Sequence, residues 1–285
     1  EDKAKDIIKQ LTMDLKSVAE VKTSYSDEQE WIRISSKAYS IYLQQQKQQR
    51  VFDLQKPHFG ASSNDTIDEI INLNDRLSEY ALGIPVTTTM MELRQYVEHA
   101  DGLPDSEQTL FEHIASYNMS PKFRAIQKNG RFKHYSIFKE FNQIIDAALI
   151  CYYRRNYISC FLTLVPVIEG VLLRWSGYDG SVDKLNFENY RAFFKNGARR
   201  NPCPGNVLFY EVFSKLCDNV LNKHLYKPTT SGDSYGDFNR HLALHLLKTP
   251  EFGTRNNCIR LFMLLDNMTE IYLYEEGFND PRFGL

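Results

Sequence analysis

The sequence lacks the cysteine patterns that would indicate a disulfide framework or a structural zinc site. Its five cysteines are dispersed and form no Cys-x-x-Cys pair; they are Cys151, Cys160, Cys203, Cys217 and Cys258. Small disulfide-rich domains and zinc modules carry paired, closely spaced cysteines instead. We therefore expect a reducing compartment, most simply the cytoplasm, and no metal or other cofactor.

A long apolar run is also missing, although a membrane span needs about 20 consecutive apolar residues. The longest candidate, residues 158–173, contains Glu169 and is flanked by arginines. We see no secretory signal at the start of the sequence. These features predict a protein without a membrane segment.

A strong charge of either sign is absent as well. The formal net charge is −2, with 34 Lys and Arg against 36 Asp and Glu. Any contact with nucleic acid must therefore come from a local patch rather than from the whole molecule. Aromatic residues make up 13% of the chain, more than a disordered chain carries, and 285 residues are enough for one large domain or two ordinary ones.

Strand-like alternation and internal repeats are missing too, and apolar residues recur at helical spacing. The first half predicts helices that start near Ser26 and near residue 65, followed by helices over residues 87–100 and 106–117. No motif in this half indicates chemistry. We expect an all-α protein in which residues 1–120 form an N-terminal helical accessory domain.

The second half, residues 131–285, predicts a helical bundle. Its candidate helices are residues 138–152, 157–175, 187–194, 207–225 and 257–274. The segment 157–175 is apolar almost all round, which is typical of a buried central helix. Glu169 lies in that run, and because an unpaired buried carboxylate is costly, it should meet an arginine, a histidine or backbone donors. Asn129-Gly130 predicts a turn at the domain boundary.

Two clusters of basic residues are candidate RNA contacts. The first lies between Ser120 and His134 and interleaves six basic residues with Phe123 and Phe132. Basic and aromatic side chains together are typical of a surface that binds phosphates and bases, although an exposed linker has the same composition. The second cluster precedes residue 201. From these clusters we expect Lys128, Arg131, Arg199 and Arg200 to contact the substrate.

The stretch Asn239-Arg240-His241-Leu242-Ala243-Leu244-His245 is the main candidate for chemistry. Cleaving RNA without a metal requires a base for the ribose 2′-hydroxyl, an acid for the leaving oxygen and a cation for the phosphate. Histidine titrates near neutrality, and arginine binds phosphate through a bidentate fork. Arg240 and His245 match these needs and are the predicted catalytic residues. His241 joins them as a site residue by the resemblance given below, and we expect Asn239 to contact the substrate.

Other interpretations of this stretch stay open. His241 and His245 are four residues apart and share a helical face, as in a two-histidine metal site, but the glutamate of His-Glu-x-x-His is missing and no third ligand is evident. The stretch could also be a polar helix start. Arg94 and His99 repeat the spacing of Arg240 and His245, so the spacing alone is not distinctive.

Geometry constrains a shared site as well. Residues five apart on a continuous helix point about 140° apart, so Arg240 and His245 would not share a face. Either the helix begins inside the motif, or the site is assembled from two copies of the chain.

Residues 240–245 resemble the Arg-[Asn/Asp/His]-x3-His signature of the HEPN superfamily, whereas the pair at Arg94 does not because Gln95 follows it. Residues 165–172 and 257–266 are similar to helices of bacterial members, so the resemblance covers roughly residues 131–276. Many relatives have Gly where this chain has Leu246, a departure that bears on the backbone turn after His245.

The resemblance implies an antiparallel helical bundle, a homodimer that joins two motifs in one cleft, and metal-independent endoribonuclease activity. It also implies a toxin–antitoxin or anti-phage setting, with RNA as substrate and an antitoxin or regulatory partner. By the same resemblance, Arg240 stabilises the phosphate, His245 is the general acid/base, and His241 orients the site or contacts substrate. The alternatives are a non-catalytic module that binds RNA, nucleotide or protein, and a structural adaptor.

Overall fold

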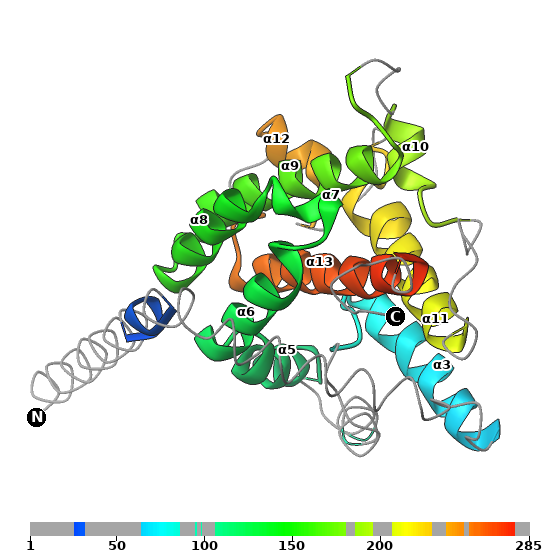
Figure 1. Cartoon of the computed structure of the whole chain (residues 1–285). Coiled ribbons are helices and arrows are strands. Elements are labelled where there is room, and N and C mark those ends of the chain that lie inside the picture. Colours follow the sequence, from blue (N-terminus) through cyan, green and yellow to red (C-terminus); the bar gives the residue numbers. More distant parts are fainter. Residues whose placement is uncertain are drawn as a thin grey trace, which may run out of the picture.

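The structure is a computed structural model that describes residues 26–31, 64–85, 95, 98, 106–180, 186–195, 207–229, 238–247 and 251–276. Every regular element in these ranges is a helix (Figure 1). This confirms the predicted all-α fold class.

The described helices follow one another along the chain from residue 26 to residue 276. Besides the helical residues 26–31 they are α3 (Asn64–Glu79), α5 (Ser106–Asn118), α6 (Pro121–Gln127), the π-helix η1 (Lys128–Phe132), α7 (Ser136–Lys139), α8 (Asn142–Tyr153), α9 (Tyr157–Trp175), α10 (Phe187–Arg191), α11 (Val207–Asn219), the π-helix η2 (Val220–Leu225), α12 (Arg240–Leu244) and α13 (Arg255–Glu276).

Helices α9 and α13 form the centre of the molecule, and α13 crosses the middle of Figure 1. Helix α9 packs against α7, α8, α12 and α13, and α13 also packs against α5 and α11. Within the described ranges, α9 is the one helix long and apolar enough to cross a membrane by length and composition, but half of that segment is buried inside the protein. Its contacts with four helices make α9 the core helix that the sequence predicts.

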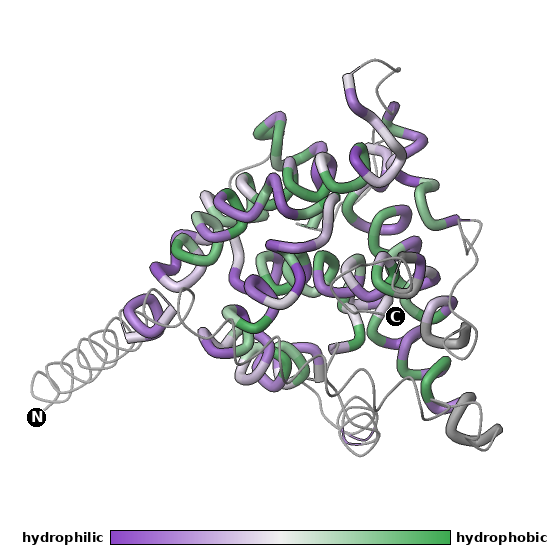
Figure 2. Tube along the Cα trace, viewed as in Figure 1, coloured by the Kyte–Doolittle hydropathy of each residue, from purple (hydrophilic) through white to green (hydrophobic). Residues whose placement is uncertain are grey.

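The described helices share one hydrophobic core. Trp31, Leu73 and Phe111 from the first half belong to the same buried cluster as Phe161 and Leu264 from the second. Helix α3 packs on α11, and α5 packs on α13. Figure 2 shows hydrophilic and hydrophobic residues alternating along α5 and α8, as in amphipathic helices around a common core. The division of the chain into two domains, residues 1–120 and residues 131–285, stays a prediction.

The helical residues 26–31 are held against the turn between α8 and α9. Arg154 donates two hydrogen bonds to the Glu28 carboxylate, at 2.9 and 2.6 Å. The rings of Trp31 and Tyr153 lie 6.4 Å apart. Of the predicted helix over residues 87–100 the structure describes only Gln95 and Glu98, so the pair Arg94 and His99 lies outside the described residues.

Two expectations about helix boundaries were wrong. Asn129-Gly130 does not form a turn, because the backbone continues from α6 into η1 and Asn129 is buried. The stripe over residues 138–152 is not one helix, because α7 ends at Lys139 and Phe141 caps α8. At this break the Phe141 ring approaches Gly170 of α9 so closely that a Cβ there would lie 2.5 Å from Cζ.

Candidate active site

Asn239 builds the start of α12. Its backbone is extended, and its side-chain oxygen accepts hydrogen bonds from the backbone N–H groups of His241 at 2.9 Å and Leu242 at 3.2 Å. Its amide nitrogen donates to the carbonyl of Lys227 at 2.9 Å, just past η2. Because Asn239 is buried and its amide is engaged at both ends, these contacts give it a structural role. They lend no support to the predicted substrate contact.

The bounds of α12 bear on the geometric question that the motif raises. The helix begins at Arg240 and ends at Leu244, and His245 is its C-cap with φ −96° and ψ 1°. Because the helix already includes Arg240, its start does not bring Arg240 and His245 onto one face, and a site assembled from two copies of the chain stays a prediction.

The turn after His245 is a Schellman motif. The N–H of Leu247 donates to the carbonyl of Leu242 at 3.1 Å, and that of Leu246 donates to Ala243 at 3.3 Å. Leu246 has φ +49°, the left-handed conformation that glycine adopts at no steric cost. The chain thus makes the turn that a glycine would favour, but with a leucine whose side chain is 67% exposed.

Arg240 is bound to Glu169 of the neighbouring helix α9. The Arg240 Nε donates to Glu169 Oε1 at 2.8 Å, and both side chains are partly exposed. This confirms that Glu169 meets an arginine. Within the described part of the chain, no hydrogen bond engages the two terminal nitrogens of this guanidinium. The ion pair therefore orients a guanidinium whose terminal nitrogens could bind phosphate.

The two histidines lie side by side, as expected from their spacing. Their ring centroids are 4.6 Å apart with an interplanar angle of 56°. His245 is exposed and His241 is half-buried. Burial lowers the pKa of His241, and the neighbouring His245 and Arg240 lower it further. A neutral imidazole can both donate and accept a hydrogen bond, which suits a residue that orients the site or contacts substrate.

Two tyrosines lie next to the ion pair of Arg240 and Glu169, and neither was a predicted site residue. Tyr226, at the end of η2, places its hydroxyl 3.4 Å from Glu169 Oε1. The Tyr190 ring of α10 stacks on it with centroids 5.7 Å apart. Burial and the Glu169 charge raise the pKa of Tyr190 to about 12. No local sequence pattern links Tyr190 to Arg240 or Glu169.

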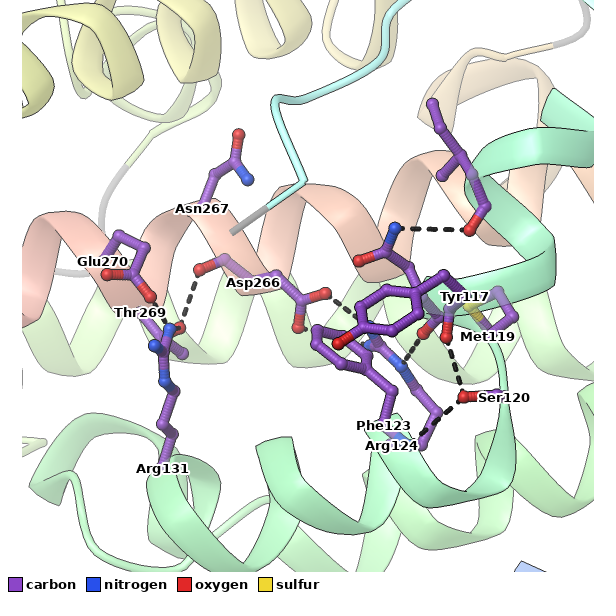
Figure 3. A network of polar contacts seen from close by, with 12 residues as sticks. Tyr117, Met119, Ser120, Phe123, Arg124, Arg131, Asp266, Asn267, Thr269 and Glu270 are labelled. Carbon is purple, nitrogen blue, oxygen red and sulfur yellow. Dashed lines mark hydrogen bonds and ion pairs between the residues drawn. The ribbon is translucent and has the colours of Figure 1, made fainter. Parts of the chain in front are cut away.

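The basic residues of the first cluster are largely paired within the fold (Figure 3). Arg124 is buried and its Nη2 lies 2.5 Å from Asp266 Oδ2. Arg131 pairs with Glu270. Outside the view of Figure 3, Lys128 pairs with Asp146. These contacts support a structural role for Lys128 and Arg131 rather than the predicted RNA contact. Arg199 and Arg200 lie outside the described residues.

The described side chains include no group of three or more His, Cys, Asp or Glu that could hold a metal ion. His241 and His245 thus have no third protein ligand of these types in the ranges that the structure covers. No protein-family model, curated protein or solved structure matches the chain.

Proposed function

We propose that the protein is a metal-independent endoribonuclease of HEPN type. The observation that carries this proposal is the arrangement on α12, where Arg240 is oriented by Glu169 and the rings of His241 and His245 lie 4.6 Å apart. The short helix and its C-cap thus present a phosphate-binding guanidinium and two imidazoles, the side chain most often used for acid/base catalysis. The resemblance of residues 240–245 to the HEPN signature adds to this support.

In the proposed reaction, a base removes the proton of a ribose 2′-hydroxyl, and the 2′-oxygen attacks the adjacent phosphorus. The bond to the 5′-oxygen breaks, an acid protonates that oxygen, and a 2′,3′-cyclic phosphate remains. Arg240 stabilises the charge on the phosphate oxygens. His245, which is exposed to an incoming strand, is the general acid/base, and His241 orients the site or contacts substrate.

We further propose that two copies of the chain join their α12 helices around the substrate. Leu246 and Leu247, directly after His245, are 67% and 56% exposed. Exposed leucines beside a polar site are typical of an interface. A homodimer would give the cleft two arginines and four imidazoles. A cytoplasmic toxin–antitoxin or anti-phage setting, with a silencing partner, follows from the same resemblance.

RNA cleavage in the presence of EDTA tests the catalytic proposal. We expect the wild-type chain to cleave, and Arg240→Ala and His245→Ala each to lose about 10²–10⁴-fold in rate, as is typical of an acid/base or a charge-stabilising group. The chain supplies a matched control, since Arg94→Ala/His99→Ala removes a pair with the same spacing. That variant should cleave like the wild type.

An intact RNA with the wild-type chain, or cleavage that survives both α12 substitutions, would contradict the catalytic proposal. RNA retention without cleavage, unaffected by His245→Ala, would instead support the non-catalytic binding module.

A further inference from the structure

A second candidate site lies where the first residue of α9 and the first residue of α13 line the same cavity. A cavity of about 500 Å³ opens between the helical residues 26–31, the end of α5, the turn between α8 and α9, and the first residue of α13. Its volume is within the range of roughly 300–1,000 Å³ that small-molecule sites occupy. Asp27, Tyr152, Arg155, Tyr157 and Arg255 line it, and no residue of the α12 motif does.

Arg155 occupies a position that favours glycine. It follows the C-cap of α8 with φ +60°. The Asn156 N–H donates to the Cys151 carbonyl at 2.8 Å, and the Arg155 N–H donates to Tyr152 at 2.9 Å, which makes another Schellman motif. A residue other than glycine in the left-handed region has a free-energy cost that glycine lacks. The chain bears this cost at a residue that places a guanidinium on the cavity wall.

The second guanidinium belongs to Arg255 and is held in place by its neighbours. Its Nη1 donates to Glu112 Oε1 at 2.6 Å, and it also hydrogen-bonds to Tyr152. The side chain is still 36% exposed. A positioned arginine of this kind binds phosphate better than a freely rotating one, because less side-chain entropy is lost on binding.

The remaining walls offer aromatic surface and a carboxylate. The rings of Tyr152 and Tyr157 meet edge to face, 5.7 Å apart. Tyr157 is half-buried, so part of it faces the cavity. Asp27 is also half-buried, and burial followed by repulsion from Glu30 raises its pKa. A carboxylate that lines the same cavity can accept hydrogen bonds from sugar hydroxyls.

From these observations we infer that the cavity binds a nucleoside monophosphate. The phosphate lies against Arg155 and Arg255, the base packs on the tyrosine rings, and the sugar hydroxyls donate to Asp27. This site is separate from α12 and does not depend on the proposed nuclease activity.

Equilibrium dialysis of the purified full chain against radiolabelled AMP, GMP, CMP and UMP tests the inference, with inorganic phosphate as a further probe. We expect at least one nucleotide to bind at least about tenfold more tightly than phosphate, because a stacked base contributes about 1–3 kcal/mol. Arg155→Gly and Arg255→Gln should each weaken that binding about tenfold or more, as for loss of a charge-assisted hydrogen bond.

Arg155→Gly is the informative variant because glycine suits φ +60°, so the protein should unfold at an unchanged or higher temperature while it loses the ligand. Arg174→Ala, which removes an exposed arginine paired with Glu140, is the matched control and should bind like the wild type.

The inference is overturned if no nucleotide binds at millimolar concentration, or if phosphate binds as tightly as every nucleotide. It is also overturned if Arg174→Ala weakens binding as much as Arg155→Gly does.

Discussion

Leu246 illustrates how a single backbone angle can be tested. Its φ of +49° is strained for leucine, and its side chain is largely exposed. We expect Leu246→Gly to raise the free energy of unfolding by about 0.5–1 kcal/mol, because relief of strain exceeds the added entropy of the unfolded glycine. Chemical denaturation measures this difference.

Leu246→Ala serves as the control, since it removes the side chain but keeps the strain. If the alanine and glycine variants are equally stable, the left-handed conformation is not the source of the effect.

His241 offers a second test at the scale of one residue. Its pKa is lowered by burial and by the nearby His245 and Arg240. His245→Gln removes one of the neighbours that lower this pKa, so the pKa of His241 should rise toward its ordinary value of about 6.5. An NMR titration of the imidazole protons follows the change. A pKa that stays the same would mean that the two rings do not interact in solution.

The partner of a site residue could be predicted from the sequence where the neighbouring residues alone show that a partner is required. Glu169 had to find a cationic or hydrogen-bonding partner because of the apolar run around it, and the structure provides Arg240. Tyr226 and Tyr190 could not be found in this way. Their contact with each other depends on how η2 and α10 pack, which no helical period encodes.

At the scale of helices, the long apolar segments were predictable and the junctions were not. Residues 157–175 coincide with α9, and residues 207–225 coincide with α11 together with η2. The turn expected at Asn129-Gly130 failed because the preference of glycine for turns is weaker than the burial of the adjacent Lys128 and Phe132 in η1. The ends of three helices were also hard to predict from the sequence. Glycine is the usual residue at positive φ after a helix, but α3, α8 and α12 are followed there by Ala81, Arg155 and Leu246.

The contact between η2 and the end of α3 predicts a pH dependence of stability. His224 Nε2 lies 3.1 Å from the Ser78 carbonyl, and burial lowers the pKa of this histidine. Since the folded pKa lies below the unfolded value of about 6.5, the contribution of His224 is fully present above that pH and is lost as the pH falls through the folded pKa.

The free energy of unfolding should therefore decrease below about pH 6.5, and less so in His224→Gln, which retains a donor for Ser78. Urea titrations of both proteins between pH 5 and 8 give the comparison. Parallel curves for the two proteins would rule out His224 as the source.

For the molecule as a whole, the buried pair of Arg124 and Asp266 joins α6 to α13. Asp266→Ala would leave the Arg124 charge buried without a partner, and we expect a loss of about 3–5 kcal/mol. Arg124→Met/Asp266→Leu, which fills the space with apolar atoms, should regain most of that stability. Urea denaturation of the three proteins measures it. A double variant as unstable as Asp266→Ala would contradict this account.

This pair also explains why the basic run between Ser120 and His134 was misleading. A local window of sequence contains its cations but not the carboxylates that neutralise them, and Asp266 lies 142 residues from Arg124. Basic residues that pair with distant carboxylates in the folded protein are therefore mistaken for exposed residues when only the neighbouring sequence is considered.

The central place of α13 has a consequence for the order in which the chain emerges from the ribosome. Helices α5, α9 and α11 all pack on α13, yet each is synthesised before it. Until α13 has left the exit tunnel, their inner faces lack the surface that covers them, and the core cannot close. Arg240 and His245 precede α13, so the nascent chain carries its candidate nuclease residues before it carries the scaffold that holds Glu169 in place. The contact between Arg240 and Glu169 is therefore expected to form only after α13 has left the exit tunnel.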